Sequence, residues 1–287
     1  MVWVIWISLL LLGAWFSVVL LRDFFRHRKQ LEPHTSWVTT MAIGSVVNFF
    51  DTLGIGAFAP QTALLKFTRQ TDDRLLPGTL NVANTLPVLT QALIFITVIE
   101  VEPLTLALML LSAGGGAVLG AGVVSRLPER KIRLTMGLAL LMTAAFMFAG
   151  KMEWIQGAGD AIGLSGGKLA IAVTINFLLG ALMTAGVGLY APCMALVFAL
   201  GMSPKVAFPI MMGSCAFLMP MASIRFIKAC AYNRKASLSM ILPSVLAVFI
   251  AVYIVKSLPL DAMRWLVMVV LLFTSVVMLR AGSRGGG

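Results

Sequence analysis

The chain has 287 residues, of which 60% are hydrophobic and 11% charged, and its mean hydropathy is +0.97. Soluble domains contain roughly 45–50% apolar and about 25% charged residues, so the composition excludes a soluble globular protein and predicts a polytopic all-α membrane protein. The net charge of +11 indicates basic loops that face anionic lipid, not a nucleic-acid partner.

The N-terminal apolar segment is long enough for one span of a ~30 Å hydrocarbon core. It lacks a basic n-region and a cleavage site, and a basic cluster follows it, so it predicts a retained transmembrane helix. The expected division of the chain is an N-terminal helix at 1–21, a basic cytoplasmic loop at 22–36, a first repeat at 37–150, an external loop at 151–167, a second repeat at 168–280 and a flexible tail at 281–287.

Each repeat is expected to contain one broken apolar stretch followed by three transmembrane helices. The broken stretches, 37–67 and 168–200, are too long for one straight crossing and too short for two, which predicts re-entrant helical hairpins. The interruption Gly54-Ile55-Gly56 returns 132 residues later as Gly186-Val187-Gly188, and six of fourteen positions are identical when residues 54–67 are aligned with residues 186–199. A duplicated break in two apolar segments is typical of a transporter's binding site.

Charge bias favours the hairpins. If both broken stretches return to their own side, seventeen of the 22 basic residues lie in cytoplasmic loops, whereas full crossings would give a split of twelve to ten. One hairpin plus three helices makes an odd number of crossings, so the second repeat would be inverted relative to the first. A shared site is then expected near the bilayer centre.

The breaks suggest a chemistry for this site. Pro60 and Pro192 suit the first turn of a helix, so a second half-helix should begin near Phe58 and near Tyr190. The free N–H groups and positive dipole ends of these half-helices would attract an anion, and the glycines would let it approach the backbone. Asp51, whose repeat equivalent is Met183, either carries a coupled proton or holds the hairpin tip through backbone hydrogen bonds.

The expected substrate site combines the two breaks with nearby polar residues. Its residues are Asn48, Asp51, Thr52, Gly54, Gly56, Phe58, Pro60, Gln61, Asn81, Asn84, Thr184, Gly186, Gly188, Tyr190, Pro192, Cys193 and Ser214. Cys193, Cys215 and Cys230 are expected to be buried thiols. Gly114-Gly115-Gly116 predicts close helix packing, and the basic stretches 126–133 and 225–235 predict cytoplasmic loops at a lipid surface.

The motifs Asn48–Pro60, Asp72–Asn81 and Gly186–Pro192 resemble those of the TauE/SafE sulfite exporter family, and the resemblance covers about residues 37–279. The resemblance implies a bacterial inner-membrane permease for sulfite, sulfonates or other small sulfur-containing anions. Two features depart from the family pattern: Ala57-Phe58 replaces further glycines at the first break, and an additional N-terminal helix is present.

The main hypothesis is thus a secondary transporter of a small anion. The expected partners are that anion, membrane lipid and protons as coupling ion, with a homodimer as a candidate assembly; no cofactor, metal or nucleic acid is expected. The alternatives are a passive anion channel, a carrier of an unrelated small carboxylate, or a membrane scaffold. An enzyme is not expected, because both histidines lie in the first loop and Asp51 has no carboxylate partner in the apolar segments.

Overall fold

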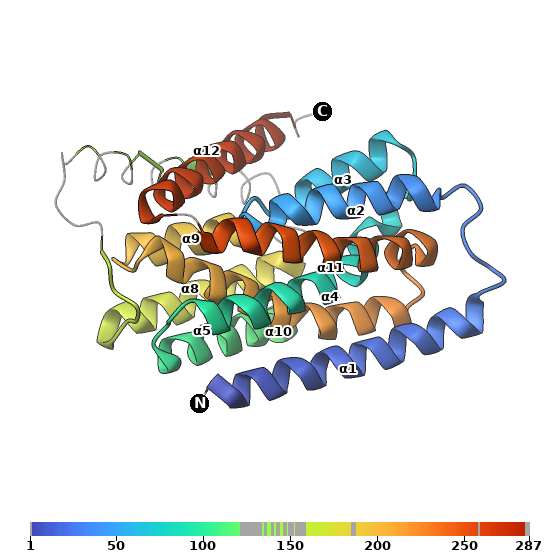
Figure 1. Ribbon diagram of the computed structural model, residues 1–287. Coiled ribbons are helices and arrows are strands. Elements are labelled where there is room, and N and C mark those ends of the chain that lie inside the picture. Colours follow the sequence, from blue (N-terminus) through green and yellow to red (C-terminus); the bar gives the residue numbers. More distant parts are fainter. Residues whose placement is uncertain are drawn as a thin grey trace.

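The computed structural model describes residues 2–120, 159–184, 188–257 and 259–284, together with isolated positions between 134 and 152. The described chain is all-helical and contains no strand (Figure 1). The basic stretch 126–133, most of the third helix expected for the first repeat and part of the external loop 151–167 lie outside the described residues.

Five of the described helices are long and apolar enough to cross a membrane, which agrees with a helical membrane protein. They are α1 (Val2–His27), α4 (Leu76–Val98), α8 (Gly166–Thr184), α10 (Ala207–Lys228) and α11 (Arg234–Ser257). The remaining described α-helices are α2 (Trp37–Thr52), α3 (Phe58–Phe67), α5 (Pro103–Gly115), α9 (Tyr190–Ala199) and α12 (Leu260–Arg284), with a π-helical turn η2 (Gly116–Gly120) after α5.

The two broken stretches have matching boundaries. Both α3 and α9 are ten residues long, and α9 begins and ends 132 residues after α3. Their C-terminal ends match as well: Arg69 and Gly201 have φ of 53° and 90°. The next residue donates its backbone N–H to a carbonyl in the last turn, Gln70 to Leu65 and Met202 to Val197. Left-handed residues with this bonding pattern end many helices.

Each broken stretch returns to the end of the molecule from which it starts. Before α2, the Ser36 backbone N–H donates to Gln70 Oε1 beyond α3, at 2.6 Å. In the second stretch, Lys168 Nζ near the start of α8 donates to the Leu200 carbonyl beyond α9, at 3.1 Å. Figure 1 shows α3 running back beside α2.

The helices of the two halves exchange partners. The first-half helix α2 packs mainly on α11, and the second-half helix α8 packs on α5 and η2. Glycines allow both approaches: a Cβ at Gly44 would clash with Met240 and Ser244, and one at Gly180 would clash with the Ala113 backbone. Gly116 likewise meets the Phe177 backbone, so the close packing expected for the glycine run is confirmed there.

The connecting segments gather at two opposite ends. At one end, which carries most of the described basic residues, Asn233 Nδ2 donates to Thr35 Oγ1 and the Gln70 carbonyl, and Tyr232 donates to Asp23. At the other end, the Glu102 backbone N–H donates to the Ile162 carbonyl. We call these the basic end and the acidic end; the acidic end carries Glu100, Glu102, Asp160, Lys168 and Lys205.

Helix α1 lies along one side of the bundle and packs against α10 and α4 (Figure 1). A cluster of buried residues joins them, including Phe16, Leu20 and Ile224. Two expected boundaries and one expected burial are corrected. The first helix extends to His27 because its basic last turn remains helical, and α12 continues to Arg284 through four residues of the expected tail. Cys230 is exposed, because it occupies the left-handed position that ends α10.

Candidate functional site

The first break lies between α2 and α3 and is made by two glycines. Gly54 and Gly56 have φ of 98° and 87°, values that side-chain-bearing residues rarely adopt. Because the chain turns here, α3 begins at Phe58, as the sequence predicts, and α9 correspondingly begins at Tyr190. Phe58 is buried, and Pro60 lies in the first turn of α3, where its missing N–H leaves no helical hydrogen bond unmade.

Asp51 lies one turn before this break, and it is only 2% exposed. Gln91 Nε2 on α4 donates to Asp51 Oδ2 and to Thr52 Oγ1, each at 2.9 Å. Asp51 also accepts a hydrogen bond from the Ala57 backbone N–H, so it holds the turn against the start of α3. This contact corresponds to the second of the two roles that the sequence allows for Asp51.

The second break reaches the same cluster through Tyr190. Its hydroxyl donates to Gln91 Oε1 at 2.8 Å, and it also lies beside Asp51. The Gln91 amide thus faces acceptors with its nitrogen and the phenol donor with its oxygen, which fixes its orientation. We call Asp51, Thr52, Gln91 and Tyr190 the break cluster; it connects α2, α4 and α9, and therefore both halves of the chain.

Direct packing also brings the breaks together. A Cβ at Gly54 would lie 3.3 Å from the Met194 methyl carbon of α9, and one at Gly56 would lie 4.0 Å from Tyr190 Cβ. At Gly188 a Cβ would meet no described atom within 4 Å, so there is open space beside the second break. Thr184 is the last residue of α8, and Gly186 lies outside the described residues.

A second buried network surrounds Asn48 and Asn84. Asn48 Nδ2 donates to Asn84 Oδ1 at 2.9 Å and to Ser244 Oγ on α11 at 3.0 Å. Asn84 Nδ2 donates to Gln61 Oε1, and Gln61 Nε2 contacts Met240 Sδ at 3.0 Å. These amides link α2, α3, α4 and α11, so they join helices of both halves without opening to solvent.

The polar residues of the second half form a separate contact. Asn176 Nδ2 on α8 donates to Ser214 Oγ at 3.0 Å and to the Met109 carbonyl at 2.7 Å. Asn48 Oδ1 and Asn176 Oδ1 are buried and have no hydrogen-bond partner among the described residues. Cys193 is fully buried beside the half-buried Pro192 in the first turn of α9, as expected for a core thiol.

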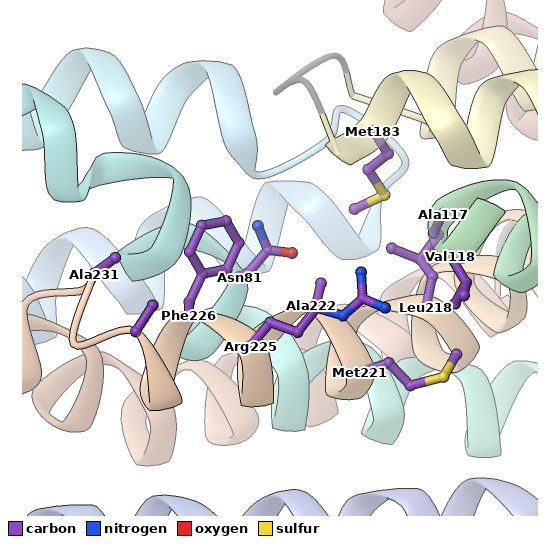
Figure 2. A pocket seen from close by; sticks show the side chains of 11 residues that line it. Asn81, Ala117, Val118, Met183, Leu218, Met221, Ala222, Arg225, Phe226 and Ala231 are labelled. Carbon is purple, nitrogen blue, oxygen red and sulfur yellow. The ribbon is translucent and has the colours of Figure 1, made fainter. Parts of the chain in front are cut away.

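Asn81 is separated from the other expected site residues. Its Nδ2 donates to the Pro77 carbonyl of its own helix, and the side chain lines a cavity of about 380 Å³. Figure 2 shows this cavity between α4, α8, α10 and the turn η2, with Met183 on one side and Arg225 on the other. The sequence interpretation of 225–235 as a lipid-facing loop is therefore incomplete, because Arg225 still belongs to α10 and lines the cavity.

Several residues of the site were not among the expected ones. Gln91 is central to the break cluster, and Ser244 and Asn176 complete the two other networks. The available signal was a lone amide or hydroxyl within a long apolar span. Such a side chain is expected to be buried against a hydrogen-bond partner, but the sequence does not identify that partner.

Among the described residues, no group of three or more His, Cys, Asp or Glu side chains could hold a metal ion. Comparisons of the chain with protein-family models, curated proteins and solved structures gave no match. The geometry of the breaks is therefore the basis for a functional proposal.

Proposed function

We propose that this protein is a secondary transporter that moves a small anion across a membrane through a site between two broken helices. The observation that carries the proposal is the break cluster, where Gln91 joins Asp51 at the first break to Tyr190 at the second. Buried, non-helical backbone at the centre of an apolar bundle is tolerated where it lies within protein or lines a cavity, and such breaks form binding sites in many transporters.

The proposed architecture is two inverted repeats, each a re-entrant hairpin plus three transmembrane helices, preceded by α1. The equal boundaries and equal C-terminal turns of α3 and α9 support a duplication. The exchange of partners, α2 on α11 and α8 on α5, is what a pseudo-two-fold relation between the halves would produce.

The proposed substrate is an anion because the starts of α3 and α9 meet at the cluster. A helix N-terminus presents free N–H groups and the positive end of the helix dipole, and neither Ala57 nor Leu189 covers its helix with a side-chain cap. Asp51 competes with an incoming anion when it is ionised. Protonation of Asp51 would remove that repulsion, so we propose that a proton accompanies the anion.

The resemblance to the sulfite exporter family suggests sulfite, sulfonates or related sulfur-containing anions as the first candidates, in a bacterial inner membrane. The basic end would face the cytoplasm, as the positive-inside rule implies. The four residues of the break cluster are each at most 5% exposed, which favours a carrier with an occluded state over an open pore. Catalysis, a cofactor and a nucleic-acid partner are not part of the proposal.

The test is flux of sulfite, thiosulfate and simple sulfonates into proteoliposomes, with and without a pH gradient. Saturable uptake that a pH gradient accelerates is the expected result. Linear, non-competed flux would instead indicate a channel. Absence of flux for sulfur-containing and carboxylate anions, with a folded protein, would overturn the proposal and favour a scaffold.

A further inference from the structure

The cavity at the basic end has an unusual composition for a space inside an apolar bundle. Among the described residues, its wall is formed by small and apolar side chains from α8, α10 and η2, together with one cation on α10 and one amide on α4. The lining residues are Asn81, Ala117, Val118, Met183, Leu218, Met221, Ala222, Arg225, Phe226, Ala229 and Ala231.

The cavity connects the basic end to the interior. Ala229 and Ala231 follow the end of α10, whereas Met183 lies one residue before the end of α8 and so next to the second break. Leu218 and Arg225 are seven residues apart on α10, which corresponds to about 10 Å along the helix axis. Met183 also contacts the buried Cys215 thiol at 3.5 Å between sulfur atoms, so the inner wall belongs to the core around α10.

Arg225 is exposed to solvent, and its side chain runs along the cavity instead of away from the bundle. Figure 2 shows its side chain running back along α10 past Ala222, with the guanidinium toward Leu218 and Met183. Helical side chains lean toward the N-terminus of their helix, which directs a residue in the last turn inward. Within the described part of the chain, no carboxylate pairs with Arg225, whereas Arg234 is bonded to Asp23 at 2.7 Å.

We propose that this cavity is an anion-binding vestibule between the basic end and the second break, and that Arg225 is the residue that attracts the anion. A guanidinium offers five N–H donors in a planar fork, so it suits a sulfonate, sulfite or carboxylate group. The route beyond Met183 rests on the proposed transport function, but the binding of an anion at Arg225 does not.

The experiment measures the electrostatic potential in the cavity directly. In a Cys230→Ser background, Ala222→Cys places a thiol one turn from Arg225 on the same helix face. Its reaction rates are measured with an anionic and a cationic methanethiosulfonate reagent of similar size. Arg225→Gln should lower the ratio of anionic to cationic rate at least about fivefold, because a unit charge at roughly 6 Å acts strongly in a partly buried space.

Two further variants provide the controls. Lys228→Gln removes a charge at the same end but outside the cavity lining, so it should leave the ratio within about twofold. Arg225→Lys keeps the charge and should restore most of the ratio, which also excludes a folding defect as the cause. Methanesulfonate should slow labelling when Arg225 is present and have no effect in Arg225→Gln.

Anionic lipid is the other source of a negative group, and nanodiscs distinguish the two. Protection by methanesulfonate in purely zwitterionic nanodiscs supports the vestibule. If methanesulfonate gives no protection there and labelling slows only when anionic lipid is added, Arg225 binds lipid headgroups and the proposal is overturned. A ratio unchanged by Arg225→Gln also overturns it, even if transport is intact. A shifted ratio without flux of any anion would support the vestibule and overturn only the transport proposal.

Discussion

Gln91 is uncharged, but its hydrogen bonds hold the break cluster together. It donates to Asp51 and Thr52 with its nitrogen and accepts from Tyr190 with its oxygen, so from α4 it fixes side chains of α2 and α9 relative to each other. A buried amide with all its partners present holds one geometry, because any rotation leaves a buried group unbonded.

Tyr190→Phe removes one hydroxyl and leaves the ring in place. Gln91 Oε1 then loses its partner in a buried position, so the unfolding free energy should fall by about 1–3 kcal/mol. Thermal unfolding in detergent, with Gln91→Leu and the double variant completing a cycle, provides the measurement. Strictly additive costs would mean that the two side chains do not interact energetically.

Asp51→Asn tests the proton-carrying role. The asparagine keeps an acceptor oxygen for Gln91 but cannot bind and release a proton, so uptake in proteoliposomes should lose its acceleration by a pH gradient. Thr52→Val, which removes a neighbouring hydroxyl but no titratable group, is the matched control. If Asp51→Asn transported with unchanged pH dependence, only the helix-capping role of Asp51 would remain.

At the level of the elements, the first break depends on backbone conformation more than on side chains. The two positive-φ glycines end α2 and reverse the chain, and the first residues of α3 and α9 then follow from local sequence. The two breaks differ, since Gly54 is packed against Met194 whereas Gly188 is beside open space.

Gly54→Ala and Gly188→Ala should therefore differ in effect. Alanine at position 54 would have to adopt a φ near 98° and press on the Met194 side chain, which should cost about 1–3 kcal/mol. Alanine at position 188 meets no described neighbour and should leave the melting temperature nearly unchanged. Equal melting temperatures for the two variants would show that the strained turn is not limiting for stability.

Glu102 gives α5 a pH-dependent N-terminus. Hydrogen bonds from Thr105 and Leu104 lower the pKa of this carboxyl below its ordinary value of 4.5. The stabilisation is present above that value and is lost as the pH falls through the lower folded pKa. Glu102→Ala should cost about 1 kcal/mol at neutral pH and progressively less as the pH falls below 4.5, as measured by thermal unfolding over a series of pH values. A cost that does not shrink as the pH falls would contradict the cap.

At the level of the whole molecule, the distribution of charge predicts its orientation. Cys230 is exposed at the basic end, whereas Cys193 and Cys215 are buried. A membrane-impermeant thiol reagent should thus label the native protein only from the cytoplasmic side. Glu100→Cys combined with Cys230→Ser should be labelled only from the opposite side. Labelling of both positions from one side would contradict the proposed topology.

Much of this organisation could be read from the sequence, and the missing parts share a cause. Glycine and proline act on their own backbone, so Gly54, Pro60 and Pro192 identified the breaks and the starts at Phe58 and Tyr190. Gln91 is bonded to partners on other helices, and the cavity beside Arg225 is completed by other helices, whereas a single apolar span does not show which face meets which neighbour. Asn81 and Asn84 illustrate this limit. They are only three residues apart, yet Asn81 lines a cavity and Asn84 belongs to a buried hydrogen-bond network.

The exchange of partners between the halves also sets an order of assembly in time. Asn48 on α2 meets Ser244, which is 196 residues later in the chain, whereas Asn176 on α8 meets Met109, which is 67 residues earlier. At about 5–20 residues per second, the ribosome needs roughly 10–40 s to make the partner of α2. During that time the face of α2 that later packs on α11 has no partner from α11. The partner of α8 has already been synthesised when α8 is made.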